Sequence, residues 1–194
     1  MNGFNPSALS SPHPADTVDR AKRVRMVLTD VDGVLTDSRI IYDGQGTHLR
    51  AFSTRDGAAI QWLAQSGIPV GFISALDDNS TRKRADDLGV GEIHLGPQDK
   101  LATVQSILAR AGLKAVQVAY FGDDLLDLPV LLSVGFSGCP SDAAPEVQSA
   151  CNLVLHQKGG EGCFRAAAEI ILKAQGHWPG IIARYHPPKG RGQT

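Results

Sequence analysis

Cysteine is scarce in this chain of 194 residues, and the cysteines that are present form no pattern. Cys139, Cys151 and Cys163 include no Cys-x-x-Cys pair, so they indicate neither a zinc site nor a disulfide framework. The six histidines are equally scattered and lack the spacing of metal ligands. Reduced thiols are typical of the cytoplasm, which is therefore the expected location.

Long apolar runs and an excess of one charge are also missing. No apolar run approaches the roughly 20 residues that cross a bilayer, so no membrane partner is expected. Nineteen basic and twenty acidic side chains nearly cancel, whereas a nucleic-acid binder would carry a basic excess. The 42% apolar composition is typical of a globular domain with a core of its own.

The sequence predicts one domain over residues 21–178, with a flexible segment at each end. Residues 1–20 are rich in Ser, Pro, Asn and Ala and contain no apolar core segment. They are expected to form a disordered tail and not a signal peptide. Residues 179–194 finish in a stretch with two prolines and two glycines, and a flexible tail is expected there as well.

Between these ends, short β-branched runs alternate with longer helical patterns. Strands are expected at residues 24–29, 68–73, 92–95, 115–121, 134–137 and 153–155. Helices are expected at residues 56–65, 79–88, 99–111, 124–132 and 162–174, with a short one from Pro145. Residues 39–52 read instead as a β-hairpin around an Asp-Gly-Gln-Gly turn. The alternation predicts an α/β fold, a Rossmann-like parallel sheet with helices on both faces.

The most informative stretch, residues 30–37, reads Asp-Val-Asp-Gly-Val-Leu-Thr-Asp. It follows a short buried strand, and so places Asp30 and Asp32 where a parallel sheet opens to solvent. Two carboxylates this close repel each other, so a cation is expected between them. On its own, the stretch would be explained equally well by a solvated Asp-Gly turn.

Further polar residues follow the later predicted strands, and together they would support phosphoryl transfer. Asp30 would be the nucleophile that forms an aspartyl-phosphate, and Asp32 would be the general acid and base. Ser74 and Lys100 would bind phosphoryl oxygens. Asp123 would hold a divalent cation with Asp30 and the backbone carbonyl of Asp32, and all-oxygen ligands favour Mg²⁺.

Each of these residues also has an ordinary explanation. A serine after a strand is often a helix cap, and a lysine in a first helical turn is usually solvated. Acidic residues at the start of a helix interact favourably with the helix dipole. Coincidence is nevertheless a poor explanation for all of them standing in order at the ends of successive strands.

The same residues resemble the four motifs of the haloacid dehalogenase superfamily, and most closely its small capless branch, the 3-deoxy-D-manno-octulosonate 8-phosphate phosphatase family. The similar stretches are residues 30–37, Ser74, Lys100 and residues 122–130, with later landmarks at residues 140–143 and 159–162. The resemblance covers residues 24–178. It implies a Rossmann-like core, dependence on Mg²⁺ and a homotetramer. The hairpin would pack between subunits and cover the site in place of a cap domain.

The resemblance also implies a substrate site for a small phosphorylated sugar acid. Residues 51–57 are similar to the family's substrate loop. The implied substrate ligands are Asp32, Ser53, Thr54, Arg55, Asp56, Gly57, Arg84 and Lys100. Asp124 and Asp127 would support the metal site, and 3-deoxy-D-manno-octulosonate 8-phosphate is the leading candidate substrate.

Departures from the family's pattern fall at positions for substrate recognition. Ala75 and Leu76 stand where Gly-Arg is usual, and Gln61 stands where an arginine is often found. Glu161 stands in place of an arginine, as in relatives that act on nine-carbon sugar acid 9-phosphates. An arginine binds a carboxylate through two hydrogen bonds and leucine cannot, so a nine-carbon acid or another phosphosugar is the alternative substrate.

Two other classes of protein are compatible with parts of the pattern. A receiver-type signalling module also carries an acidic cluster, a hydroxyl and a lysine, but its phosphate-accepting aspartate follows a later strand. A catalytically silent oligomeric binding protein would not need the chemical residues, which are all present here. Both fit less well than a phosphatase.

Overall fold

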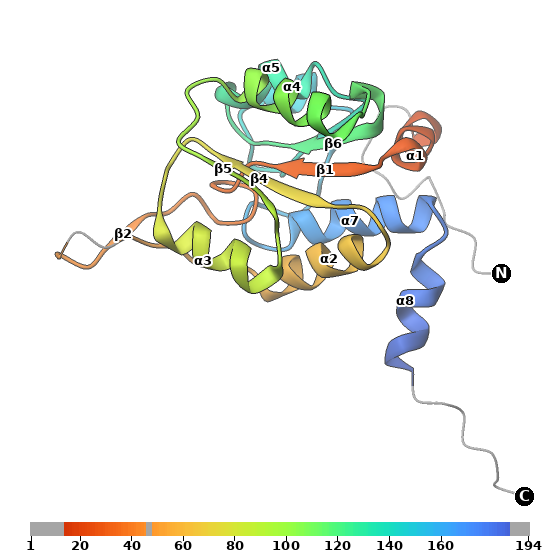
Figure 1. Ribbon diagram of the computed structural model, residues 1–194, viewed down its shortest axis with the longest axis horizontal. Coiled ribbons are helices and arrows are strands. Elements are labelled where there is room, and N and C mark those ends of the chain that lie inside the picture. The colour runs from red at the N-terminus through yellow and green to blue at the C-terminus, as the bar shows by residue number, and fades with distance from the viewer. Residues whose placement is uncertain (1–13, 46–47, 187–194) are drawn as a thin grey trace, which may run out of the picture.

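The computed structural model describes residues 14–45 and 48–186, and a six-stranded parallel sheet lies at its centre (Figure 1). The strand order is β5-β4-β1-β6-β7-β8. The strands are β1 (Met26–Thr29), β4 (Val70–Ser74), β5 (Glu92–Leu95), β6 (Val118–Phe121), β7 (Phe136–Cys139) and β8 (Leu153–Val154). Because β1 lies in the middle, between β4 and β6, the residues that follow it reach the centre of the sheet's carboxyl edge.

Helices cover both faces of the sheet, which confirms the predicted α/β class (Figure 1). One face carries α2 (Thr54–Gln65), α3 (Asn79–Leu88) and α7 (Cys163–Ala174). The opposite face carries α4 (Lys100–Ala111), α5 (Leu128–Leu131) and α6 (Pro145–Ala150). Among the described residues, none of the helices is long and apolar enough to span a membrane.

Local sequence explains where several helices begin and end. Ser53, Asp78 and Asp99 stand just before α2, α3 and α4, and each side chain accepts a hydrogen bond from a backbone N–H of the first turn. Gly89 and Gly112 end α3 and α4 in the left-handed conformation that glycine adopts without strain.

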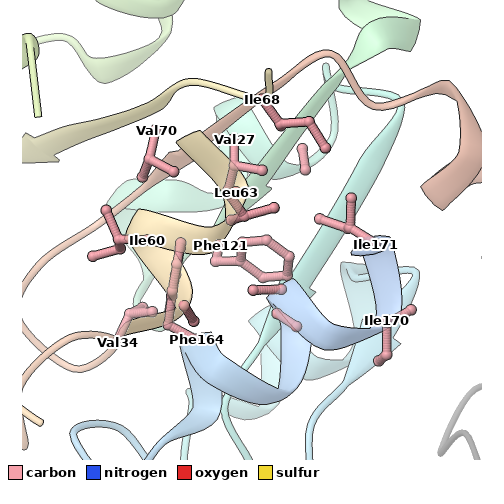
Figure 2. Packing of buried hydrophobic residues seen from close by; sticks show 14 of the residues in the cluster. Val27, Val34, Ile60, Leu63, Ile68, Val70, Phe121, Phe164, Ile170 and Ile171 are labelled. Carbon is pink, nitrogen blue, oxygen red and sulfur yellow. The ribbon is translucent and has the colours of Figure 1, made fainter. Parts of the chain in front are cut away.

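The larger apolar core lies between the sheet and the helices α2 and α7. Figure 2 shows Ile60 and Leu63 of α2 facing Phe164 of α7, with Phe121 of β6 between them. Phe121 and Phe164 meet edge to face, with their ring centroids 6.1 Å apart. Burying this face fixes the sheet beneath the loops that follow β1 and β6.

Helices extend both ends of the domain beyond the predicted boundaries. α1 (Pro14–Arg23) and α8 (Trp178–Tyr185) show that the expected tails 1–20 and 179–194 are wrong over these residues. The side chain of Gln175 donates to the carbonyls of Ala21 and Val24, which fastens the end of α1 beside α7. The composition of α1 is largely polar, so its short apolar face does not stand out in the sequence. Residues 1–13 and 187–194 lie outside the described residues.

The predicted hairpin is present and projects from the body (Figure 1). Its strands β2 (Ile41–Tyr42) and β3 (His48–Leu49) pair antiparallel, and residues 46–47 of its turn lie outside the described part. The hydroxyl of Ser80 in α3 donates to the carbonyl of His48, which fixes the base of the hairpin.

Two expected elements differ in form. Residues 115–117 make a 3-10 turn ahead of β6 and do not belong to the strand. The expected helix 124–132 is split into a 3-10 turn, Leu125–Asp127, and α5. The split arises because the carboxylate of Asp127 turns back and accepts hydrogen bonds from the backbone N–H groups of Asp123 and Asp124.

Candidate active site

The predicted catalytic residues meet at the carboxyl edge of the sheet. Asp30 follows β1 directly, Ser74 is the last residue of β4, Asp123 comes two residues after β6, and Lys100 is the first residue of α4. The backbone N–H of Asp30 donates to the carbonyl of Phe121, 2.8 Å away, which ties the loop after β1 to the end of β6. The topology therefore brings together residues that are far apart in the sequence.

A buried lysine lies between two of the carboxylates. The ammonium nitrogen of Lys100 is 3.0 Å from Asp30 Oδ2 and 2.8 Å from Asp127 Oδ1. Burial opposes the charge of Lys100, but the two carboxylates together raise its pKa. Burial raises the pKa of Asp30 well above its usual value and the charge of Asp127 adds to this, while Lys100 lowers it. Lys100 therefore balances the charges of Asp30 and Asp127, whereas the cation in contact with Asp32 is Arg50.

Asp127 organises the cluster from below and is fully buried. Its Oδ1 accepts from Lys100 and, at 2.6 Å, from the hydroxyl of Tyr120, while its Oδ2 accepts from backbone N–H groups. Burial and then the charge of Asp127 raise the pKa of Tyr120 well above its usual value, so this hydroxyl stays a donor. Tyr120 is missing from the sequence-based site, because an apolar-looking strand position gives no signal of it.

Three carboxylates are close enough to share one cation. Oxygens of Asp30, Asp123 and Asp127 all lie within 4.8 Å of one another. Asp123 Oδ1 is buried and has no hydrogen-bond partner. Burial, followed by the charges of Asp127 and Asp124, raises the pKa of Asp123 to about 7. A buried oxygen without a donor beside other carboxylates fits a hard divalent cation such as Mg²⁺.

Two glycines allow the loops of the site to approach each other. Gly33 has a positive φ of 89°, and a Cβ there would lie 1.9 Å from Asp123 Oδ2. A Cβ at Gly159 would lie 2.0 Å from the carbonyl oxygen of Gly33. The backbone N–H of Gly159 is held by Asp142 Oδ1 at 3.0 Å. The late glycine run therefore packs directly on the loop that carries Asp30.

Asp32 lies at the rim of the cluster and is held by side chains. Its Oδ2 accepts from the hydroxyl of Ser74 at 3.3 Å, and its Oδ1 accepts from Thr36 at 3.4 Å. The strongest contact is with Arg50, whose Nε lies 2.7 Å from Asp32 Oδ1. Arg50 is missing from the sequence-based site, because a charged residue at the end of an expected hairpin carries no signal of such a contact.

The predicted substrate loop is divided between the surface and the interior. Thr54 and Arg55 are exposed, but Asp56 is buried and its Oδ1 accepts from the backbone N–H of Arg165 in α7. Burial, against that hydrogen bond, raises the pKa of Asp56 to about 6. Arg84 donates to the carbonyl of Ser53. A Cβ at Gly57 would meet the guanidinium of Arg84, so this position suits glycine.

In this geometry Asp56 and Arg84 fasten the loop to the body of the protein. Their role as substrate ligands, like that of Ser53, Thr54, Arg55 and Gly57, stays a prediction. The residues that depart from the family's pattern lie on the surface: Gln61, Ala75, Leu76 and Glu161 are all exposed. Asp124 is exposed as well, and its carboxylate caps the 3-10 turn through the backbone N–H of Leu125.

A parallel sheet with buried Asp30 and Lys100 and half-buried Asp123 at its carboxyl edge is the arrangement of a haloacid dehalogenase-like hydrolase. The family model of haloacid dehalogenase-like hydrolases matches residues 89–166. The 3-deoxy-D-manno-octulosonate 8-phosphate phosphatase of Haemophilus influenzae is 39% identical over 157 residues, which cover 81% of this chain and 87% of that protein.

Solved structures agree with this similarity. The phosphatase of the same name from Yersinia pestis has a TM-score of 0.84 at 38% identity, over 86% of this chain and 90% of that chain. The enzyme from Moraxella catarrhalis, solved with magnesium, phosphate and KDO, has a TM-score of 0.87 at 33% identity, over 88% and 98% of the chains. The chain belongs to the 3-deoxy-D-manno-octulosonate 8-phosphate phosphatase family, and it is a phosphoric monoester hydrolase.

Proposed function

We propose that this chain hydrolyses the phosphate monoester of a 2-keto-3-deoxy sugar acid, with 3-deoxy-D-manno-octulosonate 8-phosphate as the leading substrate. The observation that carries the proposal is the contact of Lys100 with both Asp30 and Asp127 beside the unpaired oxygen of Asp123. The positive charge of Lys100 and a site for a hard metal ion, both next to the nucleophilic carboxylate of Asp30, would together attract a phosphate dianion. The relatives named above act on this sugar phosphate.

In the proposed mechanism, an oxygen of Asp30 attacks phosphorus and forms an aspartyl-phosphate. Asp32 gives a proton to the leaving alkoxide and takes one from the water that attacks the intermediate. Ser74 and Lys100 bind phosphoryl oxygens, and Lys100 also lowers the pKa of Asp30 against the burial that raises it. The hydrogen bonds of Asp127 keep the ammonium of Lys100 in place throughout.

Mg²⁺ is the cofactor, and Asp30, Asp123 and the backbone carbonyl of Asp32 would hold it, with Asp124 and Asp127 in support. When bound, it neutralises charge on the phosphoryl oxygens and lets a dianion approach the carboxylates. The orphaned oxygen of Asp123 supports this assignment.

A nine-carbon sugar acid 9-phosphate is the second candidate substrate. Leu76 and Glu161 are both exposed, so neither residue is needed for packing, and both are available to a substrate. A leucine offers no charge to a carboxylate, and a glutamate repels one. These residues support a site whose sugar end differs from that of the eight-carbon enzymes.

The assembly we propose is a homotetramer in the cytoplasm. Ile41, Tyr42 and Leu49 on the hairpin are 56%, 65% and 49% exposed, and an exposed apolar patch on a projecting element favours burial between subunits. The cysteines Cys139, Cys151 and Cys163 are free thiols, which is compatible with a reducing compartment.

One experiment tests the substrate and the chemistry together. Phosphate release is measured from eight-carbon and nine-carbon sugar acid phosphates and from simple sugar phosphates, with Mg²⁺ and after EDTA treatment. We expect release only with the metal, and the highest kcat/KM on a 2-keto-3-deoxy acid. Equal rates on all esters would contradict the substrate, and no release from any ester would contradict the phosphatase.

A further inference from the structure

We propose that Arg50 is a positioning residue for Asp32, and that it couples the hairpin to the acid–base step. This inference rests on the proposed phosphatase function and adds to it a residue outside the predicted site. The guanidinium of Arg50 lies between Asp32 on one side and Asp78 on the other. The row Asp32–Arg50–Asp78 joins the active-site rim to the start of α3.

The first contact of the row fixes one oxygen of Asp32. Arg50 Nε lies 2.7 Å from Asp32 Oδ1, and its Nη2 lies 3.5 Å from Oδ2. The other side-chain bonds to Asp32 are long, at 3.3 Å from Ser74 and 3.4 Å from Thr36. Arg50 therefore dominates the orientation of this carboxylate, since charge-assisted bonds of this length are the strong ones.

The second contact fixes Arg50 itself. Its Nη1 lies 2.9 Å from Asp78 Oδ1, an ion pair without hydrogen-bond geometry. Asp78 is in turn held by Thr81, whose N–H and hydroxyl donate to it at 3.0 and 2.8 Å. The N-terminus of α3 favours the negative charge of Asp78. The negative charges of Asp32 and Asp78 are thus balanced by the guanidinium of Arg50 and by the N-terminus of α3.

Burial shows that this arginine does not serve as a free surface charge. The side chain of Arg50 is 0% exposed, and those of Asp32 and Asp78 are 21% and 5% exposed. An arginine so enclosed and paired with two carboxylates is not available to bind the carboxylate of a substrate. We therefore assign to Arg50 the role of holding Asp32 in position.

The orientation has a chemical consequence. Arg50 binds Oδ1 at 2.7 Å and reaches Oδ2 only at 3.5 Å, and Oδ2 faces the hydroxyl of Ser74, a proposed ligand of the phosphoryl group. Oδ2 is therefore the oxygen that exchanges the proton with the leaving group and the attacking water. Without Arg50 the carboxylate can rotate, and the proton is delivered from a poorer position.

The row also extends to the hairpin. Arg50 directly follows β3, and the carbonyl of His48 in β3 accepts from the hydroxyl of Ser80 in α3 at 2.8 Å. The same helix therefore holds both the base of the hairpin and, through Asp78, the guanidinium. Displacement of the hairpin moves Arg50 and with it the acid–base carboxylate.

The test uses the dependence of kcat on the leaving group. An alkyl phosphate needs a proton on the departing oxygen, whereas 4-nitrophenyl phosphate leaves as a stable anion and needs it much less. With general acid–base catalysis contributing about 10²–10⁴-fold, Arg50→Met should lower kcat on a sugar phosphate by about tenfold or more. On 4-nitrophenyl phosphate we expect less than about threefold loss, and Arg50→Lys should restore part of the activity on the sugar phosphate.

A double-mutant cycle separates positioning from general support of the fold. In the Asp32→Asn background, Arg50→Met should have no further effect on kcat, because the carboxylate it positions is gone. Arg110→Met removes an exposed arginine that pairs with Glu92 and is the matched control, with native kinetics expected. Circular dichroism and the mass in solution are compared for all variants.

The outcomes are distinguishable. Equal losses on both substrates, or additive effects of Arg50→Met and Asp32→Asn, would overturn the positioning role and leave the phosphatase intact. A native protein that releases phosphate from no ester would overturn the proposed function itself, before Arg50 is considered.

Discussion

The two halves of the active site are built in opposite ways. In the phosphate half, Asp30, Lys100 and Asp127 are buried and joined by short charged contacts, and half-buried Asp123 lies beside them. The sugar half that we propose comprises the hairpin, the substrate loop and the segment at Leu76, and it carries exposed side chains. The phosphate half is complete within a single chain, whereas the proposed sugar half presents exposed side chains.

The difference follows from what each half must recognise. A phosphate and a divalent cation require several charges within contact distance, and such charges are stable only when each is paired and fixed. A sugar acid is recognised by groups at the periphery, where a change of one side chain costs the fold little. Chemistry can therefore stay constant while the substrate changes.

Asp30→Asn is expected to produce the largest effect. An amide cannot attack phosphorus, so turnover should fall by several orders of magnitude. The fold should survive because Lys100 keeps its ion pair with Asp127, and burial already disfavours the charge of Asp30. Phosphate release and thermal unfolding of the purified variant check this. Substantial turnover by the variant would contradict the role of Asp30 as nucleophile.

Removal of the metal should be nearly as severe, and binding of the metal should depend on pH. A proton and Mg²⁺ compete for the carboxylate of Asp123, whose pKa is raised to about 7 by burial and by Asp127. Below that pH the proton occupies the ligand, so affinity should weaken by up to about tenfold for each unit of pH lost. Above it, affinity should level off.

Titrations with Mg²⁺ at pH 6, 7 and 8, followed by calorimetry, measure this dependence. Asp124→Asn is a suitable comparison, because Asp124 is exposed and contributes to the raised pKa of Asp123 only after burial and Asp127. A dissociation constant that stays the same over this range would contradict a site through Asp123.

Charged substitutions on the hairpin test whether the sugar half depends on the proposed interface between subunits. Tyr42→Asp combined with Ile41→Asp should convert the proposed tetramer to smaller species, because the 65% and 56% exposed side chains would no longer favour burial between subunits. We expect a loss of kcat/KM of about tenfold, smaller than for Asp30→Asn, since the phosphate half is complete in one chain. Light scattering and kinetics on the same samples measure both effects. A native protein that is monomeric at micromolar concentration would contradict the tetramer.

The same comparison explains what the sequence could predict. The sequence identifies Asp30, Ser74 and Asp123 because each stands at or just after a strand end, where a parallel sheet must gather its ligands, and Lys100 because it starts the helix that follows the next strand. The six-stranded sheet itself was predicted from alternating periodicity and is confirmed. These signals are local in the sequence. The topology of the sheet then brings the residues that carry them close together in space.

Other features depend on contacts between distant segments and left no local signal. Tyr120 reads as an ordinary strand residue, and only its hydrogen bond to Asp127 reveals it. Arg50 reads as part of a hairpin, and Asp56 reads as a helix start and substrate residue, although its carboxylate accepts from Arg165 of α7, 109 positions away. The helices α1 and α8 are stabilised by packing against the domain and were mistaken for tails.

The last expected effect is a gain and not a loss, and it concerns the identity of the sugar, through Leu76→Arg. Leu76 is 43% exposed, so its side chain is not required for packing, and its backbone N–H donates to Ser74 Oγ at 3.2 Å, which places the residue next to the proposed phosphate site. One charge-assisted hydrogen bond contributes about 1.5–3 kcal/mol, so an arginine here should raise kcat/KM for octulosonate 8-phosphate by roughly ten- to a hundredfold. Neighbouring Asp77, which pairs with Arg82 at 2.6 Å, could compete for the new guanidinium and hold the gain near the lower limit. Leu76→Lys is the matched variant, since it adds the charge without the planar fork and should gain less.

If the native protein already prefers this substrate strongly and Leu76→Arg brings no increase, the sugar end is adapted to the eight-carbon acid by other residues. A clear gain would show that the chain kept the phosphate half of its family while its sugar half changed.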